Sequence, residues 1–192
     1  MQPEKKRRIA PLFFRLQHGS MRLVTWNTQW CRGVDGRVSP ERIVRHARAL
    51  GDFEVLCLQE IACNYPGLEG GVPGDQAREL AALLPGFVLF FGASVDEFDV
   101  DGDFNVQPHD PEHAALVEPF AGGAWWDAWP LVHGQEPRVP TFSVHEQKAT
   151  DQPVAFDFVF VSDELKGRVR SFVVDGATQA SDHQPTLVEL GG

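Results

Sequence analysis

The chain has 192 residues, of which 43% are hydrophobic, and its formal net charge is −10. This length predicts a single domain with a real apolar core, and no apolar stretch is long enough to predict a membrane-spanning helix. The negative charge argues against long-range attraction of a polyanion. A phosphoester could still bind locally through a metal ion, because the charge of the ion inverts the local field.

The first twenty residues differ in composition from the rest of the chain. A basic run at residues 5–8 precedes a short apolar stretch, which Arg15 interrupts. We therefore interpret residues 1–20 as a loose N-terminal extension and residues 21–192 as one domain.

The first half of that domain alternates strand-like and helix-like segments. Apolar runs predict three strands, at residues 22–26, 53–58 and 86–92. The first is expected to be buried, and the second is too apolar to have an exposed face. Amphipathic patterns predict two helices, at residues 40–50 and 76–84. Ser39 and Asp75 are suited to cap the starts of these helices. The alternation is typical of an α/β fold.

The second half contains further strand-like segments among irregular stretches. Strands are predicted at residues 156–161, 170–174 and 186–190. A short helix is predicted to begin near Pro111, and a helical turn at residues 162–167. Packing anchors are the favoured interpretation, and a base-stacking platform the alternative, for three tryptophans: Trp125, Trp126 and Trp129.

The cysteines indicate a reducing compartment. Cys31, Cys57 and Cys63 are odd in number and lack the paired spacing of a metal site. Cys57 lies in an apolar run and is expected to be a buried thiol. A disulfide framework is therefore not predicted, and a cytoplasmic location fits best.

Polar side chains follow several of the predicted strands, where an α/β fold collects distant residues at one edge of its sheet. Glu60 follows the second strand, and a carboxylate there is a natural ligand for Mg²⁺. Asn27 ends the first strand, and its amide could bind a phosphate oxygen or orient Glu60. The plainer alternatives are a surface carboxylate for Glu60 and a turn-forming residue for Asn27.

Gly102-Asp103-Phe104-Asn105 carries two more polar candidates. Asp103 and Asn105 share a face, because strand side chains repeat every two residues. Asp103 could hold or deprotonate an attacking water, and Asn105 could bind the phosphate. A turn rich in Gly, Asp and Asn is the alternative.

Two acidic positions near the C-terminus complete the set. Asp157 lies inside the apolar run 155–160, where an unpaired charge would be costly, so it needs a donor such as a histidine or a metal-site network. A structural buried hydrogen bond is the alternative. Asp182 can orient the neighbouring His183, whose ring could contact a phosphate or move a proton.

In this order, the motifs resemble the endonuclease/exonuclease/phosphatase superfamily, which has the fold of pancreatic deoxyribonuclease. The resemblance covers residues 21–190 and lies in five motifs: Thr25-Trp26-Asn27, Leu58-Gln59-Glu60, Gly102-Asp103-Phe104-Asn105, Phe156-Asp157-Phe158-Val159 and Ser181-Asp182-His183-Gln184-Pro185. It implies a four-layered α/β sandwich with the site at one rim. It also implies one or two Mg²⁺ or Mn²⁺ ions and in-line attack of water on a phosphoester.

The resemblance also implies a role for each site residue. Glu60 would bind the metal, and Asn27 and Asn105 would orient metal and phosphate. Asp103 would position the water. Asp182 and His183 would bind metal or stabilise the pentavalent transition state.

The sequence departs from the family before the Gly-Asp-Phe-Asn motif. The family has a long block there with several strands and a Thr-His motif, whose His contacts the phosphate and pairs with the Asp of the Phe-Asp-Phe-Val segment. Here only Ser94 to Asp101 fills the interval, and the chain has no Thr-His dipeptide. We therefore predict a sandwich incomplete in its middle strands, in which Asp157 lacks its expected partner; His133 and His145 are the possible substitutes.

The sequence thus predicts a divalent-metal-dependent phosphoester hydrolase that acts on a nucleic acid or a small molecule. Loss of an imidazole that contacts the transition state predicts turnover lower by ~10²–10⁴. One alternative is a degenerate, non-catalytic relative that binds a metal or a partner. Another is a calcium loop at residues 99–110, although Phe104 stands where such loops need Gly. The sequence leaves the substrate and the oligomeric state open.

Overall fold

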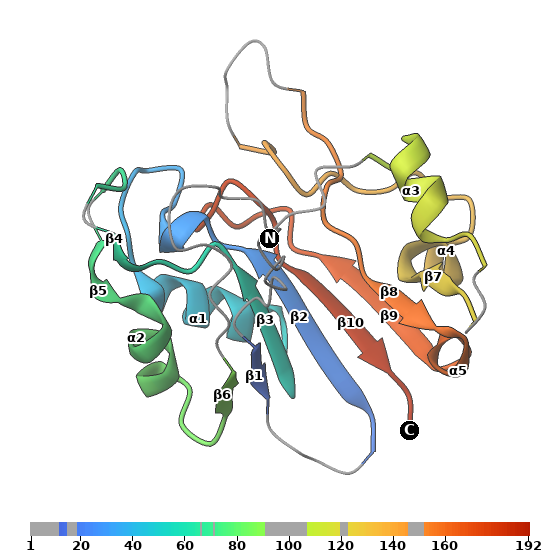
Figure 1. Cartoon of the computed structure of the whole chain (residues 1–192), viewed down its shortest axis with the longest axis horizontal. Coiled ribbons are helices and arrows are strands. Elements are labelled where there is room, and N and C mark those ends of the chain that lie inside the picture. The colour runs from blue at the N-terminus through green and yellow to red at the C-terminus, as the bar shows by residue number, and fades with distance from the viewer. Residues whose placement is uncertain are drawn as a thin grey trace, which may run out of the picture.

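The computed structural model describes residues 12–14, 19–65, 67–70, 72–90, 107–119, 123–145 and 152–192. They form an α/β fold around one six-stranded sheet (Figure 1). The order of its strands is β6 (Val88–Phe90), β1 (Leu12–Phe14), β3 (Val55–Gln59), β2 (Met21–Asn27), β10 (Thr186–Leu190) and β9 (Val169–Val174). Two small sheets pair β4 (Cys63–Tyr65) with β5 (Val72–Asp75), and β7 (Trp125–Asp127) with β8 (Phe160–Ser162).

The helices are short apart from the first two. Figure 1 shows α1 and α2 towards the β3 side of the sheet, and α4 and α5 towards the β9 side. Their bounds are α1 Pro40–Leu50, α2 Gln76–Leu83, α3 Pro111–Leu116, α4 Ala128–His133 and α5 Asp163–Lys166, with one helical turn, η1, at Gln29–Cys31. None of the described helices has the length and apolar content that a membrane span requires.

The central strands bring distant residues to one end of the sheet. β2 runs parallel to β3, with Asn27 opposite Gln59. β10 runs antiparallel to β2, with Thr186 opposite Thr25. The residues that follow β2 and β3 and those that precede β10 therefore all lie beyond the same end of the sheet.

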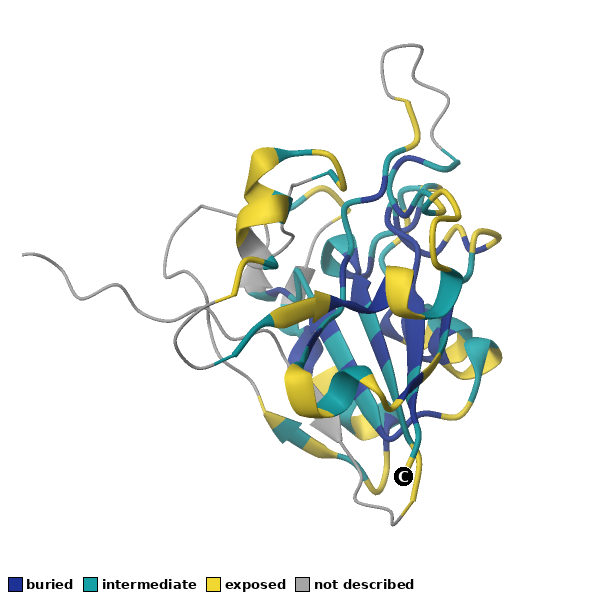
Figure 2. Cartoon of the chain, turned by 90° about the vertical axis from the view of Figure 1, so that its right-hand side faces the viewer, coloured by how far each residue is buried: buried dark blue, intermediate teal, exposed yellow. Residues whose placement is uncertain are grey.

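Strand alternation divides the apolar side chains between two cores, one on each face of the sheet. On one face, Val24 and Trp26 of β2 and Leu56 of β3 pack against α1 and α2. On the other face, Phe172 of β9 and Val188 of β10 pack against α4 and β8. In Figure 2 the buried residues lie mainly along the sheet and on the segments against it, and the exposed residues lie on outer helix faces, on turns and on the short strands β6 and β7.

The predicted helices 40–50 and 76–84 are confirmed to within one residue. Ser39 Oγ accepts a hydrogen bond from Arg42 N at 3.2 Å, and Asp75 Oδ1 accepts one from Arg78 N at 3.1 Å. Both caps satisfy N–H groups that the first turn of a helix leaves without a partner.

One predicted strand forms only in part. Residues 156–161 were expected to be a strand, but β8 begins at Phe160. The N–H groups of Phe156 and Asp157 donate to the side chain of Thr141 instead of to a neighbouring strand. Local sequence could not show this competition, because Thr141 is 15 residues away along the chain.

The expected loose extension also needs correction. Leu12–Phe14 form β1, which pairs antiparallel with both β3 and β6, placing Leu12 opposite Cys57 and Phe90. This part of residues 1–20 therefore belongs to the sheet. Residues 1–11 and 15–18 lie outside the described part of the chain.

The tryptophans and cysteines agree with the predictions in part. Trp129 is buried against Phe172, as a packing anchor should be, whereas Trp125 and Trp126 are 46% and 38% exposed. All three cysteines are free thiols. Cys57 is only partly buried, but desolvation still raises its pKa to about 11.

Candidate functional site

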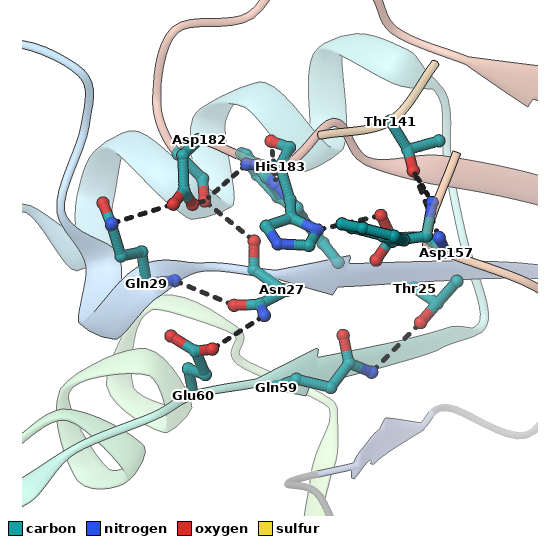
Figure 3. A network of polar contacts seen from close by, with 12 residues as sticks. Thr25, Asn27, Gln29, Gln59, Glu60, Thr141, Asp157, Asp182 and His183 are labelled. Carbon is teal, nitrogen blue, oxygen red and sulfur yellow. Dashed lines mark hydrogen bonds and ion pairs between the residues drawn. The ribbon is translucent and has the colours of Figure 1, made fainter. Parts of the chain in front are cut away.

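Three predicted site segments meet beyond the common end of β2, β3 and β10 (Figure 3). Asn27 is the last residue of β2, Glu60 follows β3, and Asp182-His183 precedes β10. Because β2 and β3 are parallel and β10 is antiparallel to them, the sheet register alone accounts for this convergence.

Asn27 lies at the centre of the network and is 1% exposed. Its Nδ2 donates to Glu60 Oε1 at 2.9 Å, and its Oδ1 accepts from Gln29 N at 3.1 Å. Its backbone carbonyl accepts from Ser181 Oγ at 2.8 Å. One buried amide therefore fixes the Glu60 carboxylate and links β2 to the segment before β10.

Glu60 has a left-handed backbone, with φ at +56°. The carbonyl of Glu60 accepts from Trp30 N at 2.8 Å. The preceding carbonyl, that of Gln59, accepts from Thr28 N and Oγ1, both at 3.1 Å. A left-handed conformation costs an L-residue about 1–2 kcal/mol. These bonds hold the turn in place, so that the half-buried carboxylate of Glu60 faces Asn27.

Gln29 is a site residue that the sequence did not predict. Its Nε2 donates to Asp182 Oδ2 at 2.8 Å, so it links the Asn27 and Asp182 segments. Gln29 begins η1, where all three residues have φ between 45° and 60°. Positive φ in residues other than glycine has no reliable local sequence signal, and so the side-chain direction of Gln29 could not be predicted.

His183 pairs with Asp157, which corrects the expectation that Asp157 lacks a histidine partner. His183 Nδ1 lies 2.9 Å from Asp157 Oδ2, and the two side chains are 5% and 9% exposed. Trp26 Nε1 donates to the His183 carbonyl at 3.0 Å, and the Phe142 ring lies 4.7 Å from the imidazole. With an ionised Asp157, this contact favours a proton on Nδ1 and fixes the orientation of the ring.

Arg138 supports the backbone behind Asp157. Its Nη1 lies 3.5 Å from the Asp157 carbonyl, and its guanidinium packs 4.4 Å from the centre of the Phe158 ring. Arg138 also forms a buried ion pair with Asp127, which in turn contacts His113. Burial lowers the pKa of Arg138, and the nearby Asp127 carboxylate opposes that effect.

Several other predicted residues do not enter this network. Asp103 and Asn105 lie outside the described residues, as do residues 99–106 of the expected calcium loop. The last residue of that loop, Asp110, accepts a hydrogen bond from Gln107 N at 2.7 Å and precedes α3. His133 Nε2 lies 2.9 Å from the Phe172 carbonyl, so it does not substitute as the partner of Asp157.

The site offers oxygen ligands to a metal, but the described residues include no group of three His, Cys, Asp or Glu side chains that could hold one. Glu60 and Asp182 supply carboxylates, linked through Asn27 and Gln29. Mg²⁺ commonly takes one or two protein carboxylates and completes its shell with waters and substrate oxygens. These residues thus fit a hydrated hard cation better than a closed structural site.

Comparison of the chain with protein-family models, with curated proteins and with solved structures gives no match in any of the three. The function must therefore be argued from the chemistry of the site.

Proposed function

We propose that this protein is a divalent-metal-dependent phosphoester hydrolase, related to the endonuclease/exonuclease/phosphatase superfamily. The observation that carries the proposal is the convergence of two polar units at one end of the sheet. One unit is the buried Asp157–His183 pair, and the other is the network of Asn27, Glu60 and Asp182. A structural role alone does not require so many distant polar groups to meet there.

Each unit has a distinct chemical task. Glu60 and Asp182 would hold Mg²⁺ or Mn²⁺, which when bound polarises a phosphoryl oxygen. Asn27 keeps the Glu60 carboxylate in place. His183, oriented through Nδ1 by Asp157, would as the doubly protonated imidazolium use Nε2–H to donate to a phosphoryl oxygen of the transition state.

Asp103 and Asn105 would complete the site in the same proposal, as the group that positions the water and as a phosphate ligand. The fold would be a four-layered sandwich whose second sheet is reduced, with β7 and β8 as its described part. The three free thiols support a cytoplasmic location. The proposed substrate is a phosphodiester or a phosphomonoester, in a nucleic acid or a small molecule.

Backbone strain gives the proposal independent support. Among the described residues, those other than glycine with positive φ number five: Gln29, Trp30, Cys31, Glu60 and Ser143. Each lies in or beside this network; Ser143 N, for example, donates to the Asp182 carbonyl at 3.1 Å. Strained residues persist where the surroundings over-determine them, and they cluster at functional sites.

The test is release of p-nitrophenol from bis(p-nitrophenyl) phosphate by protein that unfolds cooperatively. The assay compares Mg²⁺, Mn²⁺ and EDTA, and it includes the variants Glu60→Gln and His183→Gln. Glu136→Gln and His109→Gln change the same residue types at exposed positions and serve as matched controls.

We expect metal-dependent turnover that EDTA abolishes, with losses in both site variants and in neither control. Turnover that survives EDTA, or that Glu60→Gln and His183→Gln leave intact, would contradict the proposal. Binding of Mn²⁺ that depends on Glu60 without any turnover would assign the protein to the non-catalytic, metal-binding alternative.

A further inference from the structure

The segments that carry Asp157 and His183 do not pair directly as strands. Residues 156–159 precede β8, and His183 precedes β10. A third segment, which contains Thr141 and Phe142, lies between them: Phe142 forms a β-bridge with Val154 and another with His183.

The side chain of Thr141 forms hydrogen bonds with the segment that carries Asp157. The hydroxyl oxygen accepts from Phe156 N and from Asp157 N, both at 3.1 Å, as Figure 3 shows for Asp157. Thr141 is 1% exposed, so water does not compete readily for these two N–H groups. The side chain thus supplies the hydrogen-bond acceptor that the backbone of a neighbouring strand would supply in a sheet.

The backbone of Thr141 forms hydrogen bonds both with the chain just before Asp157 and with the chain just after His183. Thr141 N donates to the Val154 carbonyl at 2.8 Å, and the Thr141 carbonyl accepts from Gln184 N at 2.6 Å. Asp157 and His183 each lie within one residue of a group that Thr141 binds. Of these contacts, only the hydrogen bonds to the hydroxyl can be removed by a substitution without changing the main chain.

We propose that Thr141 is a positioning residue that sets the contact between Asp157 and His183. Its hydroxyl fixes the Asp157 backbone, its carbonyl fixes the segment after His183, and together they hold Oδ2 and Nδ1 at 2.9 Å. Thr141 acts through this pair rather than on the substrate. Its effect on turnover rests on the proposed function, whereas its effect on the pair does not.

Two substitutions separate the hydroxyl from the shape of the side chain. Thr141→Val keeps the branched shape and removes the acceptor, and Thr141→Ser keeps the acceptor. Thr186→Val is the matched control, because Thr186 is also buried but its Oγ1 has no hydrogen-bond partner among the described residues.

The first readout is the imidazole NMR signal of His183, assigned by its absence from His183→Gln. A downfield Nδ1 proton and the ¹⁵N shifts of the ring report the bond to Asp157, whether or not the protein turns over substrate. The second readout is kcat for bis(p-nitrophenyl) phosphate, with the KM measured alongside.

We expect Thr141→Val to lose the downfield Nδ1 signal and to lower kcat by about 10-fold to 100-fold with little change in KM, because a misplaced group loses catalytic geometry rather than binding. Thr141→Ser and Thr186→Val should keep the signal and the rate. If Thr141→Val does not unfold cooperatively, Thr141→Ala replaces it, because its smaller side chain leaves room for a water that satisfies the two N–H groups. Such a water does not tie these groups to the backbone of residue 141, so the same losses are expected.

Retention of the signal in a folded variant without the hydroxyl, or its loss in Thr141→Ser, would overturn the positioning role. A wild type that shows the Nδ1 signal but no turnover would contradict the proposed function alone. The NMR comparison of the variants would then still decide the role of Thr141.

Discussion

The Asp157–His183 pair and the Glu60–Asn27 pair lie at the same end of the sheet, but they differ in burial and in what holds them. Asp157 and His183 are almost fully buried, and they lie on segments outside the regular strands. Glu60 is half-buried and follows directly from β3, through a turn with positive φ. The first pair is held by long-range hydrogen bonds and the second by the sheet register and a strained turn.

This difference suits the two tasks. A buried pair keeps one geometry, because each partner would be costly to leave alone. A half-exposed carboxylate can exchange its surroundings with water, a cation or a substrate oxygen. Substitutions in the two pairs should therefore affect stability and turnover in different proportions.

Asp157→Asn should have the largest effect. It leaves the buried His183 without its carboxylate, so we expect a fall in kcat of ~10²–10⁴ and a loss of about 1–3 kcal/mol in the free energy of unfolding. Release of p-nitrophenol from bis(p-nitrophenyl) phosphate measures the loss in kcat, and urea titration measures the loss in the free energy of unfolding. Asp52→Asn, at an exposed position, should leave both quantities unchanged. An active, fully stable Asp157→Asn protein would show that the buried pair has no special role.

Glu60→Gly should separate function from stability. We expect loss of metal-dependent turnover with an unchanged free energy of unfolding. Relief of about 1–2 kcal/mol of left-handed strain should offset the entropy cost of glycine, about 0.5–1 kcal/mol, and the lost bond to Asn27, about 0.5–1.5 kcal/mol.

The matched control for Glu60→Gly is Glu79→Gly, which changes an exposed residue within α2. It should lower the free energy of unfolding by about 1 kcal/mol, since glycine is a poor helix former. Equal destabilisation by both variants would rule out a strained turn at Glu60.

Ser143→Gly should have the smallest effect of these variants, and it should stabilise the protein rather than destabilise it. Ser143 has φ at +58°, and its buried Oγ has no hydrogen-bond partner among the described residues. Glycine removes both the left-handed strain and the buried hydroxyl, which should raise the free energy of unfolding by about 1 kcal/mol. Ser171→Gly, in the extended β9, should lower it by about 0.5–1 kcal/mol. Thermal unfolding of the two variants compares them directly, and a less stable Ser143→Gly would contradict the strain.

The residues at strand ends were the part of the site that the sequence could predict. Asn27 and Glu60 each follow an apolar run, Asp182 lies shortly before another, and the topology of a mixed sheet brings such positions together. The α/β class and both long helices followed from the same periodicity and from the caps at Ser39 and Asp75.

The remainder depended on interactions that local sequence does not encode. The partner of Asp157 is 26 residues away and is reached through a segment whose key acceptor is the Thr141 side chain. Gln29 reaches Asp182 from η1, whose three residues all have positive φ. β1 pairs with β3 across more than 40 residues, although its own sequence indicated a loose extension.

The most direct test of a single shared site is the kcat/KM for bis(p-nitrophenyl) phosphate in a double-variant cycle. It compares the wild type, Glu60→Gln, Asp157→Asn and the protein with both substitutions, each with Mg²⁺. If the two pairs act on one phosphoester, the double variant should lose little more than the more damaging single variant, because residues that act as a unit are not additive. Losses that multiply, or a wild type without metal-dependent turnover, would contradict that account.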